Sequence, residues 1–579
     1  ACILFVHTLY FKMSGVRGTV HRHLTHNNSK SFFFYSDDSF SEERNTGEIE
    51  EILFELFKNE SGKVVVSRFI NALEQTGLRK MDPRLKEMLD AINQLYIESD
   101  YSSGSPESME LDLEEFKMAV KPNIVLITRA LREQFRIPQF KDFCKVIEKL
   151  FWKCKPMDEG QVADYIPQLA VYDPNYWGAS LCTVDGQRFS VGDTNIPFTL
   201  QSTSKPITYS IALNELGPDQ VHQYVGQEPS GRMFNELVLD YSRKPHNPMI
   251  NAGAIMVCSL IHTICKKDMN RSEKFEFTEN YFKKLAGGEY IGFSNSTFLS
   301  ERDSADRNYA LGYFMREHKC FPENCNLIES LDYYFQCCAL EGNCESLSVI
   351  AGTLANGGIC PITGERVLGS DAVRDVLSLM HSCGMYDYSG QFAFKVGLPA
   401  KSGVSGALML VVPTVMGMGL WSPPLDSMGN SVRGIKFCHE LVSTFSFHRY
   451  DSVKHSTRKL DPRRHKYETQ GLNVITLLFG AASGDVTAMR RHLLSGMNMD
   501  QQDYDNRTPL HLAAVEGHLD CVKFLVEQCK VKIDTKDRWG HTPYEDAKRF
   551  GHDKVAQFLL ECQEDADAVA SEKESTILE

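Results

Sequence analysis

The stretch that decides the fold of the longest segment is QSTSKPITYS, residues Gln201–Ser210. Ser202 and Lys205 are three residues apart, so at a helix start both side chains would lie on one face. Backbone N–H groups at a helix start favour negative charge that develops beside them. A lysine can act as the base for a serine nucleophile when burial or nearby positive charge lowers its pKa. The competing interpretation is an N-cap serine followed by a solvated lysine.

A second motif lies far downstream. Lys401-Ser402-Gly403 opens an apolar run within Ala400–Val412, AKSGVSGALMLVV. S-x-x-K followed by K-[ST]-G is the pairing found in penicillin-recognising serine enzymes. Together the two motifs favour a serine acyl-enzyme chemistry, and a serine β-lactamase or transpeptidase is an open alternative at this point.

Residues 139–457 surround both motifs and combine strand-like with helix-like stretches. Ser180–Asp193 reads as a hairpin with Asp185-Gly186 at its turn. Ala407–Trp421, which contains Pro413 and is too short to cross a bilayer, reads as two core strands about a turn. Strands come first and last, with long helices between them. This order predicts an α+β domain with helices packed on an antiparallel sheet.

Residues 47–138 are predicted to form a small helical domain. Glu48–Asn59 has apolar residues at helical spacing, and two later stretches repeat that pattern. The arrangement suggests a calcium-binding helix-loop-helix domain. None of its loops has alternating oxygen ligands with glycine at position six and glutamate at position twelve, so we expect no calcium site.

The C-terminal part contains a repeat. One unit begins at Asp503 and the next at Asp537, a period of 537 − 503 = 34 residues, and the first contains Thr508-Pro509-Leu510-His511. This T-P-L-H pattern is typical of ankyrin repeats, and Leu477–Gly496 fits the helical half of an earlier unit. We therefore expect a charged linker at 458–470, ankyrin repeats at 471–562 and a disordered acidic tail at 563–579. Ankyrin repeats bind other proteins, so a binding scaffold is a second possible function.

The composition narrows the possible partners. The net charge is −14, which disfavours nucleic acid as a partner. The 17 cysteines are scattered, which indicates reduced thiols and disfavours zinc. No apolar run is long enough to span a membrane. Residues 1–46 begin with an acid-free, basic and hydroxyl-rich stretch, which predicts an organelle transit peptide, with a disordered tail as the alternative.

Further stretches resemble one enzyme family. They include HNPMINAGAI at His246–Ile255, HSCGMYDYSGQFAF at His381–Phe394 and WSPPLDSMGNSVRG at Trp421–Gly434. Together with both motifs they are similar to glutaminases of the animal kidney and liver type, over roughly Thr46–Glu561. The resemblance implies a multidomain α+β protein: a helical N-terminal domain, a serine β-lactamase-like catalytic domain and C-terminal ankyrin repeats. It also implies hydrolysis of L-glutamine to L-glutamate and ammonia, without a metal or redox cofactor.

The resemblance assigns catalytic roles to five positions. Ser202 would be the nucleophile and Lys205 its base. Tyr386 would assist proton transfer at the nucleophile, and Tyr165 would be a second active-site tyrosine. The backbone N–H groups of Val404 and Ser202 would form the oxyanion hole.

The resemblance also assigns substrate contacts, to Ser202, Tyr386 and Val404 and to four further residues: Asn251, Glu301, Asn308 and Tyr334. Glu301 is an acid suited to the α-ammonium of glutamine. Glu301 and Asn308 are seven residues apart, which we interpret as two turns of one helix. A serine amidase of other specificity would not need this set. A catalytically dead ankyrin scaffold would tolerate loss of Ser202, Lys205 or Tyr386, and the presence of all three argues against it.

The family further implies regulation and assembly. Val225–Asp240 is similar to the family's gating loop, although vertebrate members usually have lysine where this chain has Glu236. Val238 and Phe314 also differ from residue types common at the family's subunit interface. We expect inorganic phosphate as an activator, a homotetramer with filaments as a further assembly state, and location in the mitochondrial matrix. The three departures leave phosphate activation and the response to interface inhibitors open, and the ankyrin partner is unknown.

Overall fold

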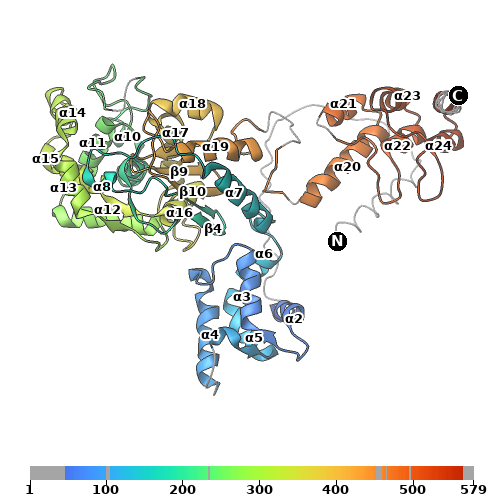
Figure 1. Ribbon diagram of the computed structural model, residues 1–579, viewed down its shortest axis with the longest axis horizontal. Helices are drawn as coiled ribbons and strands as arrows, with labels where there is room; N and C mark the ends of the chain where they lie inside the picture. Colours follow the sequence, from blue (N-terminus) through green and yellow to red (C-terminus); the bar gives the residue numbers. More distant parts are fainter. Residues whose placement is uncertain are drawn as a thin grey trace, which may run out of the picture.

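The computed structural model describes residues 46–99, 105–231, 235–451, 459–464, 466–494 and 497–564. The predicted leader, except Thr46, and almost all of the predicted acidic tail lie outside these residues. Figure 1 shows a helical domain made by the first described residues (blue), a large domain of helices around a sheet, and a row of helical repeats set to one side. No helix in the described ranges is long and apolar enough to span a membrane.

The helical domain has an aromatic core. Phe69 makes edge-to-face contacts with Phe57 and Phe116, at ring-centroid distances of 5.1 Å in both cases. A short antiparallel pair, β1 (Val64–Val65) with β2 (Glu110–Leu111), joins its two halves. Its helices are α2 (Thr46–Phe57), α3 (Val66–Gln75), α4 (Lys86–Glu98), α5 (Leu113–Val120) and α6 (Ile124–Leu131).

The large domain is built on a five-stranded antiparallel sheet in the order β4-β3-β10-β9-β8. Its strands are β3 (Gly178–Thr183), β4 (Arg188–Gly192), β8 (Ala400–Ser402), β9 (Ala407–Val412) and β10 (Met416–Trp421). The predicted hairpin is present, and Gly186 in its turn has φ +78°, a conformation that suits glycine. The predicted strand pair after Ala407 is also present as β9 and β10. The α+β prediction is therefore confirmed.

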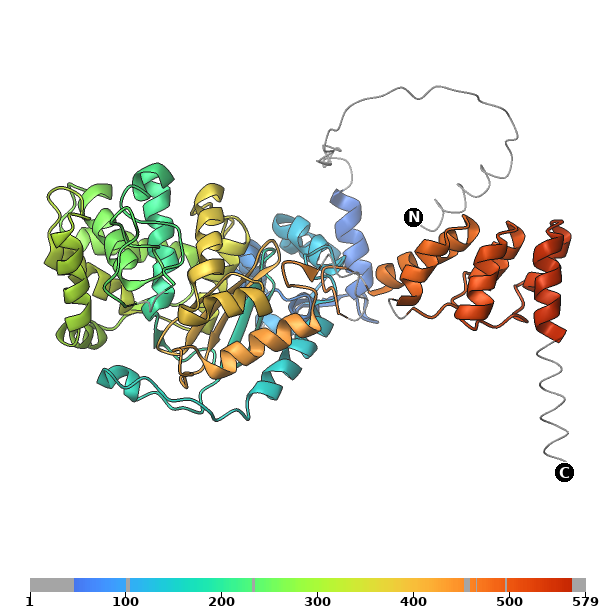
Figure 2. The same cartoon turned by 90° about the horizontal axis from the view of Figure 1, so that it is seen from above.

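Helices cover both faces of this sheet. On one face α16 (Cys344–Ala355) lies directly against β10, where Gly417 and Gly419 leave room for its backbone. On the other face α7 (Phe140–Cys154) and α19 (Val432–Thr444) pack over side chains such as Leu408, Leu410 and Met418. Figures 1 and 2 show α7 and α19 side by side at the edge of the domain.

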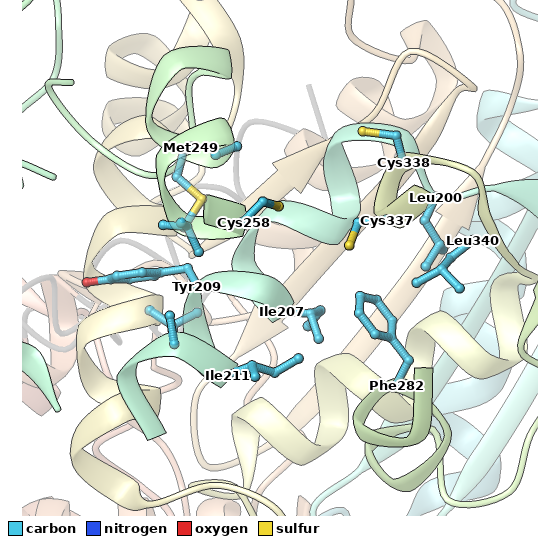
Figure 3. Packing of buried hydrophobic residues seen from close by; sticks show 14 of the residues in the cluster. Leu200, Ile207, Tyr209, Ile211, Met249, Cys258, Phe282, Cys337, Cys338 and Leu340 are labelled. Carbon is cyan, nitrogen blue, oxygen red and sulfur yellow. The ribbon is translucent and has the colours of Figure 1, made fainter. Parts of the chain in front are cut away.

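Apart from α18 (Ser389–Lys395), which packs in the same core as α7 and α19, the remaining helices form a lobe on the α16 side of the sheet. Figure 3 shows Ile207 and Ile211 packed in a core with Cys258, Cys337 and Phe282. The lobe also holds a small sheet of β5 (Phe198–Thr199), β7 (Leu340–Gly342) and β6 (Gly292–Phe293). The other helices of the large domain are α8 (Pro167–Ala170), α9 (Lys205–Leu216), α10 (Pro218–Val221), α11 (Asn251–Leu260), α12 (Arg271–Leu285), α13 (Asn295–Asp303), α14 (Asp306–Glu317), α15 (Leu327–Cys338) and α17 (Ser370–Cys383).

The helical domain is docked onto the β3–β4 hairpin. The Arg79 guanidinium pairs with Glu345 at 2.9 Å and Glu289 at 3.3 Å, both in the large domain. The Arg84 guanidinium donates to the carbonyl of Asp185 at 2.6 Å, in the hairpin turn. Gln187 Nε2 donates to the carbonyl of Thr76 at 2.8 Å. The contacts of Arg84 and Thr76 thus fix the hairpin against the helical domain.

The C-terminal helices stack as repeats. Thr508 and Thr542 are the N-caps of α22 (Pro509–Val515) and α24 (Pro543–Arg549), each followed by proline at the first helical position. The other helices are α20 (Lys466–Ala482), α21 (Val486–Leu494), α23 (Leu519–Lys523) and one over residues 553–564. Because α20 begins at Lys466, the helix starts inside the stretch that the sequence predicts as linker.

Gly417 offers a test of how the sheet packs on α16. A Cβ atom at this position would lie 2.0 Å from the backbone nitrogen of Gly352. We expect Gly417→Ala to destabilise the large domain by about 1–3 kcal/mol, because neither backbone can move aside easily. Thermal unfolding monitored by the fluorescence of the buried Trp177 and Trp421 measures this change.

Gly390→Ala is the matched control, because a Cβ atom there would meet nothing within 4 Å. The control should unfold as the parent does. Equal melting temperatures for Gly417→Ala and the parent would contradict the described packing of β10 on α16.

Candidate active site

The side chains of Ser202 and Lys205 meet at one turn. Gln201–Ser204 forms a single 3₁₀ turn that runs directly into α9 at Lys205. Lys205 Nζ donates a hydrogen bond to Ser202 Oγ at 2.8 Å. Lys205 is 1% exposed, and burial lowers the pKa of its amine to about 8. Near physiological pH a minor fraction of the molecules therefore carries a neutral amine, which can accept the serine proton.

A chain of amides continues from this pair. Lys205 Nζ also donates to Asn251 Oδ1 at 2.8 Å, and Asn251 Nδ2 donates to Asn308 Oδ1 at 3.0 Å. Asn251 is the first residue of α11. The prediction that Glu301 and Asn308 share one helix is wrong, because α13 ends at Asp303 and α14 begins at Asp306.

The carboxylate of Glu301 points into the same site. Tyr165 OH donates to Glu301 Oε1 at 2.6 Å, although half of the Tyr165 side chain is exposed to solvent. Burial raises the pKa of Glu301, and hydrogen bonds from Tyr165 and Gln201 oppose that rise. The carboxylate therefore has two neutral donors, and the Lys205 amine also acts to lower its pKa. A cationic group of a ligand would fit beside it.

Gln201 is a site residue that the sequence analysis missed. It is buried, its φ is +49°, and its side chain hydrogen-bonds Glu301. A non-glycine residue in the left-handed region is uncommon, and such strain is concentrated at functional sites. The one feature of the sequence that could have identified Gln201 as a site residue is its position immediately before Ser202.

Tyr386 closes the site from another direction. It has φ +51° and is buried, and burial raises the pKa of its hydroxyl while a hydrogen bond with Ser202 opposes the rise. Lys401 Nζ lies 4.5 Å from the centre of the Tyr386 ring and donates to the carbonyl of Ser402 at 2.8 Å. Burial and the neighbouring Lys205 lower the pKa of Lys401. Lys401, from the second motif, therefore packs against the Tyr386 ring and holds it in place.

The turn after β8 approaches the Ser202 turn closely. A Cβ atom on Gly403 would lie 3.0 Å from the carbonyl oxygen of Leu200 and 3.2 Å from Thr203 Cγ2. Val404 follows this glycine, so its backbone lies near the start of the Ser202 turn. Tyr334, on α15, is buried, and its ring centre lies 5.8 Å from Lys205 Nζ. The structure thus brings all nine predicted site residues into one region.

A cavity of about 560 Å³ opens beside Tyr386. Its wall includes Pro229, Ser230 and Glu236 from the stretch similar to a gating loop, and Asn247 and Ser389 from the body of the domain. Val238 donates its N–H to the carbonyl of Glu236, and the ring of Phe314 on α14 lies against that of His318, tilted by 55°. Of the three unusual residues, Glu236 is the one that lines the cavity.

Among the described residues, one group has side chains of metal-ligand type within 4.8 Å: Asp537, His541 and Asp546. Asp537 accepts backbone N–H groups of Trp539 and His541, and Asp546 pairs with Arg507 at 2.7 Å. Both carboxylates are therefore engaged in the repeat's own turn and ion pair. The group lies in the ankyrin repeats and not beside Ser202.

The pKa of Lys205 predicts how the reactivity of Ser202 depends on pH. A fluorophosphonate that labels activated serines should react faster as pH rises through about 8, because Lys205 loses its proton there. The labelling rate, measured by intact-protein mass spectrometry between about pH 6 and pH 10, should then level off.

Lys205→Met is the control for this measurement, and its labelling should be slow at every pH. A parent rate that does not change across this range, or labelling at another serine, would contradict the assignment of Lys205 as the base.

Sequence comparisons place these residues in a known family. The glutaminase family matches residues 160–450, an EF-hand domain matches 49–138, and ankyrin repeats in three copies match 477–570. The mitochondrial liver isoform of glutaminase from Rattus norvegicus is 52% identical over 543 residues, 94% of this chain and 87% of the relative. A glutaminase from Nostoc sp. is 45% identical over 311 residues, 54% of this chain and 91% of the relative.

Solved structures agree. The crystal structure of Mglu in its tris and glutamate form has a TM-score of 0.50 and 36% identity, and the match covers 53% of this chain and 67% of that one. The resemblance and the fold class inferred from the sequence are therefore confirmed. With Ser202 held by the buried Lys205 and with this degree of identity, the chain belongs to the glutaminase family of amidohydrolases.

Proposed function

We propose that this protein hydrolyses L-glutamine to L-glutamate and ammonia through a glutamyl ester on Ser202. The observation that carries the proposal is the 2.8 Å contact between Ser202 Oγ and the buried amine of Lys205. Its relatives in the comparisons are glutaminases, and the solved structure of Mglu was obtained with glutamate.

In the first half of the reaction, neutral Lys205 takes the Ser202 proton while Oγ bonds to the side-chain carbonyl carbon of glutamine. The carbonyl oxygen becomes an oxyanion, which the N–H groups of Ser202 and Val404 would stabilise. Removal of one such donor typically costs about 10²–10³ in rate. The C–N bond then breaks, and the departing nitrogen receives a proton from the Lys205 ammonium, with Tyr386 beside the reacting atoms.

In the second half, a water molecule attacks the glutamyl ester. Lys205, neutral again, takes a proton from the water, and the resulting oxyanion collapses to release Ser202 Oγ. The proton returns to Oγ, and glutamate leaves. Lys205 therefore acts twice as base and twice as acid, which requires a pKa near the working pH.

Substrate selection would rest on the polar groups around the pair. Glu301 is suited to the α-ammonium of glutamine because it is buried, with Tyr165 holding one of its oxygens at 2.6 Å. Asn251, Asn308 and Tyr334 supply the donors and acceptors for the α-carboxylate and the amide. A site built to pair polar groups rejects ligands that lack them, because its own groups would be left buried and unpaired.

The broader setting is also proposed here. Mitochondrial relatives that are 52% identical over 94% of this chain support a mitochondrial location, in the matrix, and the family resemblance supports a homotetramer with filaments as a further state. Inorganic phosphate is proposed as an activator, and Glu236 on the cavity wall makes its effect a question specific to this chain. The ankyrin repeats are proposed to bind a partner protein.

The direct test measures ammonia and glutamate released from L-glutamine, with and without phosphate. The parent should release both in equal amounts, while Ser202→Ala and Lys205→Arg should lose at least about 10³-fold in kcat because the nucleophile or the neutral base is missing. Ser210→Ala is the control, since its buried hydroxyl only contacts the carbonyl of Ile207 in the same helix. Folded parent protein that releases nothing at high phosphate, or a fully active Ser202→Ala, would overturn the proposal.

Glu301→Gln should weaken recognition of the α-ammonium. A hydrogen bond to a charged group contributes about 1.5–3 kcal/mol, so kcat/KM for glutamine should fall by about 10–100-fold. The same variant should change little with 5-amino-5-oxopentanoate, which lacks the α-amino group. Glu317→Gln, on the exposed part of α14, serves as the charge-matched control. An equal loss of kcat/KM with both substrates would show that Glu301 does not bind the α-ammonium group.

A further inference from the structure

Tyr386 has a backbone conformation that the surrounding structure must enforce. Its φ is +51°, and a bulky residue in the left-handed region is under strain. The chain just before it packs closely on β8, since a Cβ atom on Gly384 would lie 1.8 Å from the carbonyl oxygen of Ala400. The hydroxyl of Tyr386 forms a hydrogen bond with Ser202. The position of that hydroxyl therefore depends on whatever holds the strained backbone.

The hydroxyl of Ser389, the first residue of α18, holds the backbone on both sides of the strain. It accepts the Met385 N–H at 2.9 Å and donates to the Tyr386 carbonyl at 2.6 Å. A hydroxyl has one hydrogen to donate and lone pairs that accept, so a single serine can make both bonds. The two bonded atoms lie on either side of the Tyr386 N–Cα bond. Rotation about that bond would therefore break at least one of the two contacts.

A comparison with Ser210 shows what is particular to Ser389. A serine that donates to the carbonyl three residues earlier is common in helices. Ser210 makes such a bond with Ile207 at 2.7 Å, inside α9, where the backbone has no positive φ. At Ser389 the same kind of bond falls on a left-handed residue and is joined by a second bond. Ser210 is therefore a matched reference for a serine whose hydrogen bond serves only the fold.

The ring of Tyr386 is held by contacts of a different kind. Lys401 Nζ lies 4.5 Å from its centre, and a Cβ atom on Gly429 would lie 3.7 Å from its Cδ2 atom. These contacts pack the ring on two sides of the chain fold, but neither of them reaches the Tyr386 N–H or carbonyl. The backbone torsion therefore depends on the hydroxyl of Ser389.

Ser389 also lines the cavity beside Tyr386, so a direct contact with substrate has to be considered. Its one hydroxyl hydrogen is directed at the Tyr386 carbonyl and is not available to a ligand in the cavity. The side chain is 8% exposed, so little of it faces the cavity. These observations favour a task within the protein over a contact with substrate.

We propose that Ser389 is a positioning residue for the hydrolysis of glutamine, acting through the hydroxyl of Tyr386. The inference rests on the proposed function. The two hydrogen bonds keep the Tyr386 backbone left-handed, and the hydroxyl then stays beside Ser202. Without them the backbone relaxes towards negative φ, which moves the ring away from Ser202. Glu301 and Asn308, which are proposed to bind the polar groups of the substrate, lie on other helices and should be unaffected.

A double-mutant cycle on the full chain tests the proposal, with glutamine hydrolysis as the readout. Ser389→Ala should lower kcat by about tenfold, a part of the roughly 10²–10⁴-fold that a proton-transfer group contributes, while KM changes by less than about threefold. Tyr386→Phe retains the ring but lacks the hydroxyl. In that background Ser389→Ala should change kcat by less than about twofold. A similar tenfold fall in both backgrounds would overturn the proposal, because Ser389 would then act by another route.

Two further variants separate the hydroxyl of Ser389 from its contribution to stability. Ser389→Thr retains the hydroxyl and should keep kcat within about threefold of the parent. Ser210→Ala loses a buried hydrogen bond of the same kind, so its melting temperature should fall while its kcat is retained. Equal losses of kcat in Ser389→Thr and Ser389→Ala would show that the site requires the size of serine and not its hydrogen bonds, and would contradict the proposal.

Fluorophosphonate labelling of Ser202 keeps this inference separate from the proposed function, because it needs no glutamine. Ser389→Ala should slow labelling by about tenfold at each pH, and the rate should still rise through about pH 8, because Lys205 remains the base. A parent that is labelled but does not hydrolyse glutamine would refute the proposed function, while the labelling rates would still decide the role of Ser389. Labelling at the parent rate in Ser389→Ala would overturn the positioning role.

Discussion

The structure depends on keeping the amine of Lys205 dry beside Ser202. A buried lysine without a carboxylate in direct contact is costly when charged, so the protein lowers its pKa and holds a neutral base in place. Lys205 is the first residue of α9. Ile207 and Ile211 of this helix pack in a core with Cys258, Cys337 and Phe282 (Figure 3). Asn251 then fixes the amine from the opposite side at 2.8 Å. The apolar core of the helical lobe thus keeps water away from the Lys205 amine, which is the proton acceptor of the site.

Much of the structure could be predicted from short sequence patterns, because the interactions behind these patterns join residues that are close in the sequence. The Ser202–Lys205 spacing, the Asp185-Gly186 turn and the T-P pairs before α22 and α24 each act within a few residues. The contact between Asn251 and Asn308 joins residues 57 apart, and no periodicity predicts such a pairing. The break between α13 and α14 was missed for a related reason. Ala305 interrupts the helix while its side chain is buried in the lobe's core, and that burial depends on tertiary packing.

Two site residues illustrate a different limit. Gln201 and Tyr386 both have positive φ, a backbone conformation that cannot be predicted from their residue types. Each is held by its surroundings: Gln201 by Glu301, and Tyr386 by the amine of Lys401 against its ring. Strain of this kind is tolerated where packing over-determines the backbone, which is a property of the folded site as a whole. The flanking helical domain adds to that rigidity, since Arg79 pairs with Glu345 on α16 and Arg84 bonds the β3–β4 turn of the sheet that carries Lys401.

The central claim is that Ser202 forms a covalent glutamyl intermediate with Lys205 as its base. Rapid acid quenching during turnover of L-glutamine, followed by peptide mass spectrometry, tests it most directly. The account predicts a glutamyl ester on Ser202 that forms within one turnover and disappears when glutamine is exhausted. Glutamine hydrolysis at full rate with no covalent adduct, or with an adduct on another side chain, would contradict it.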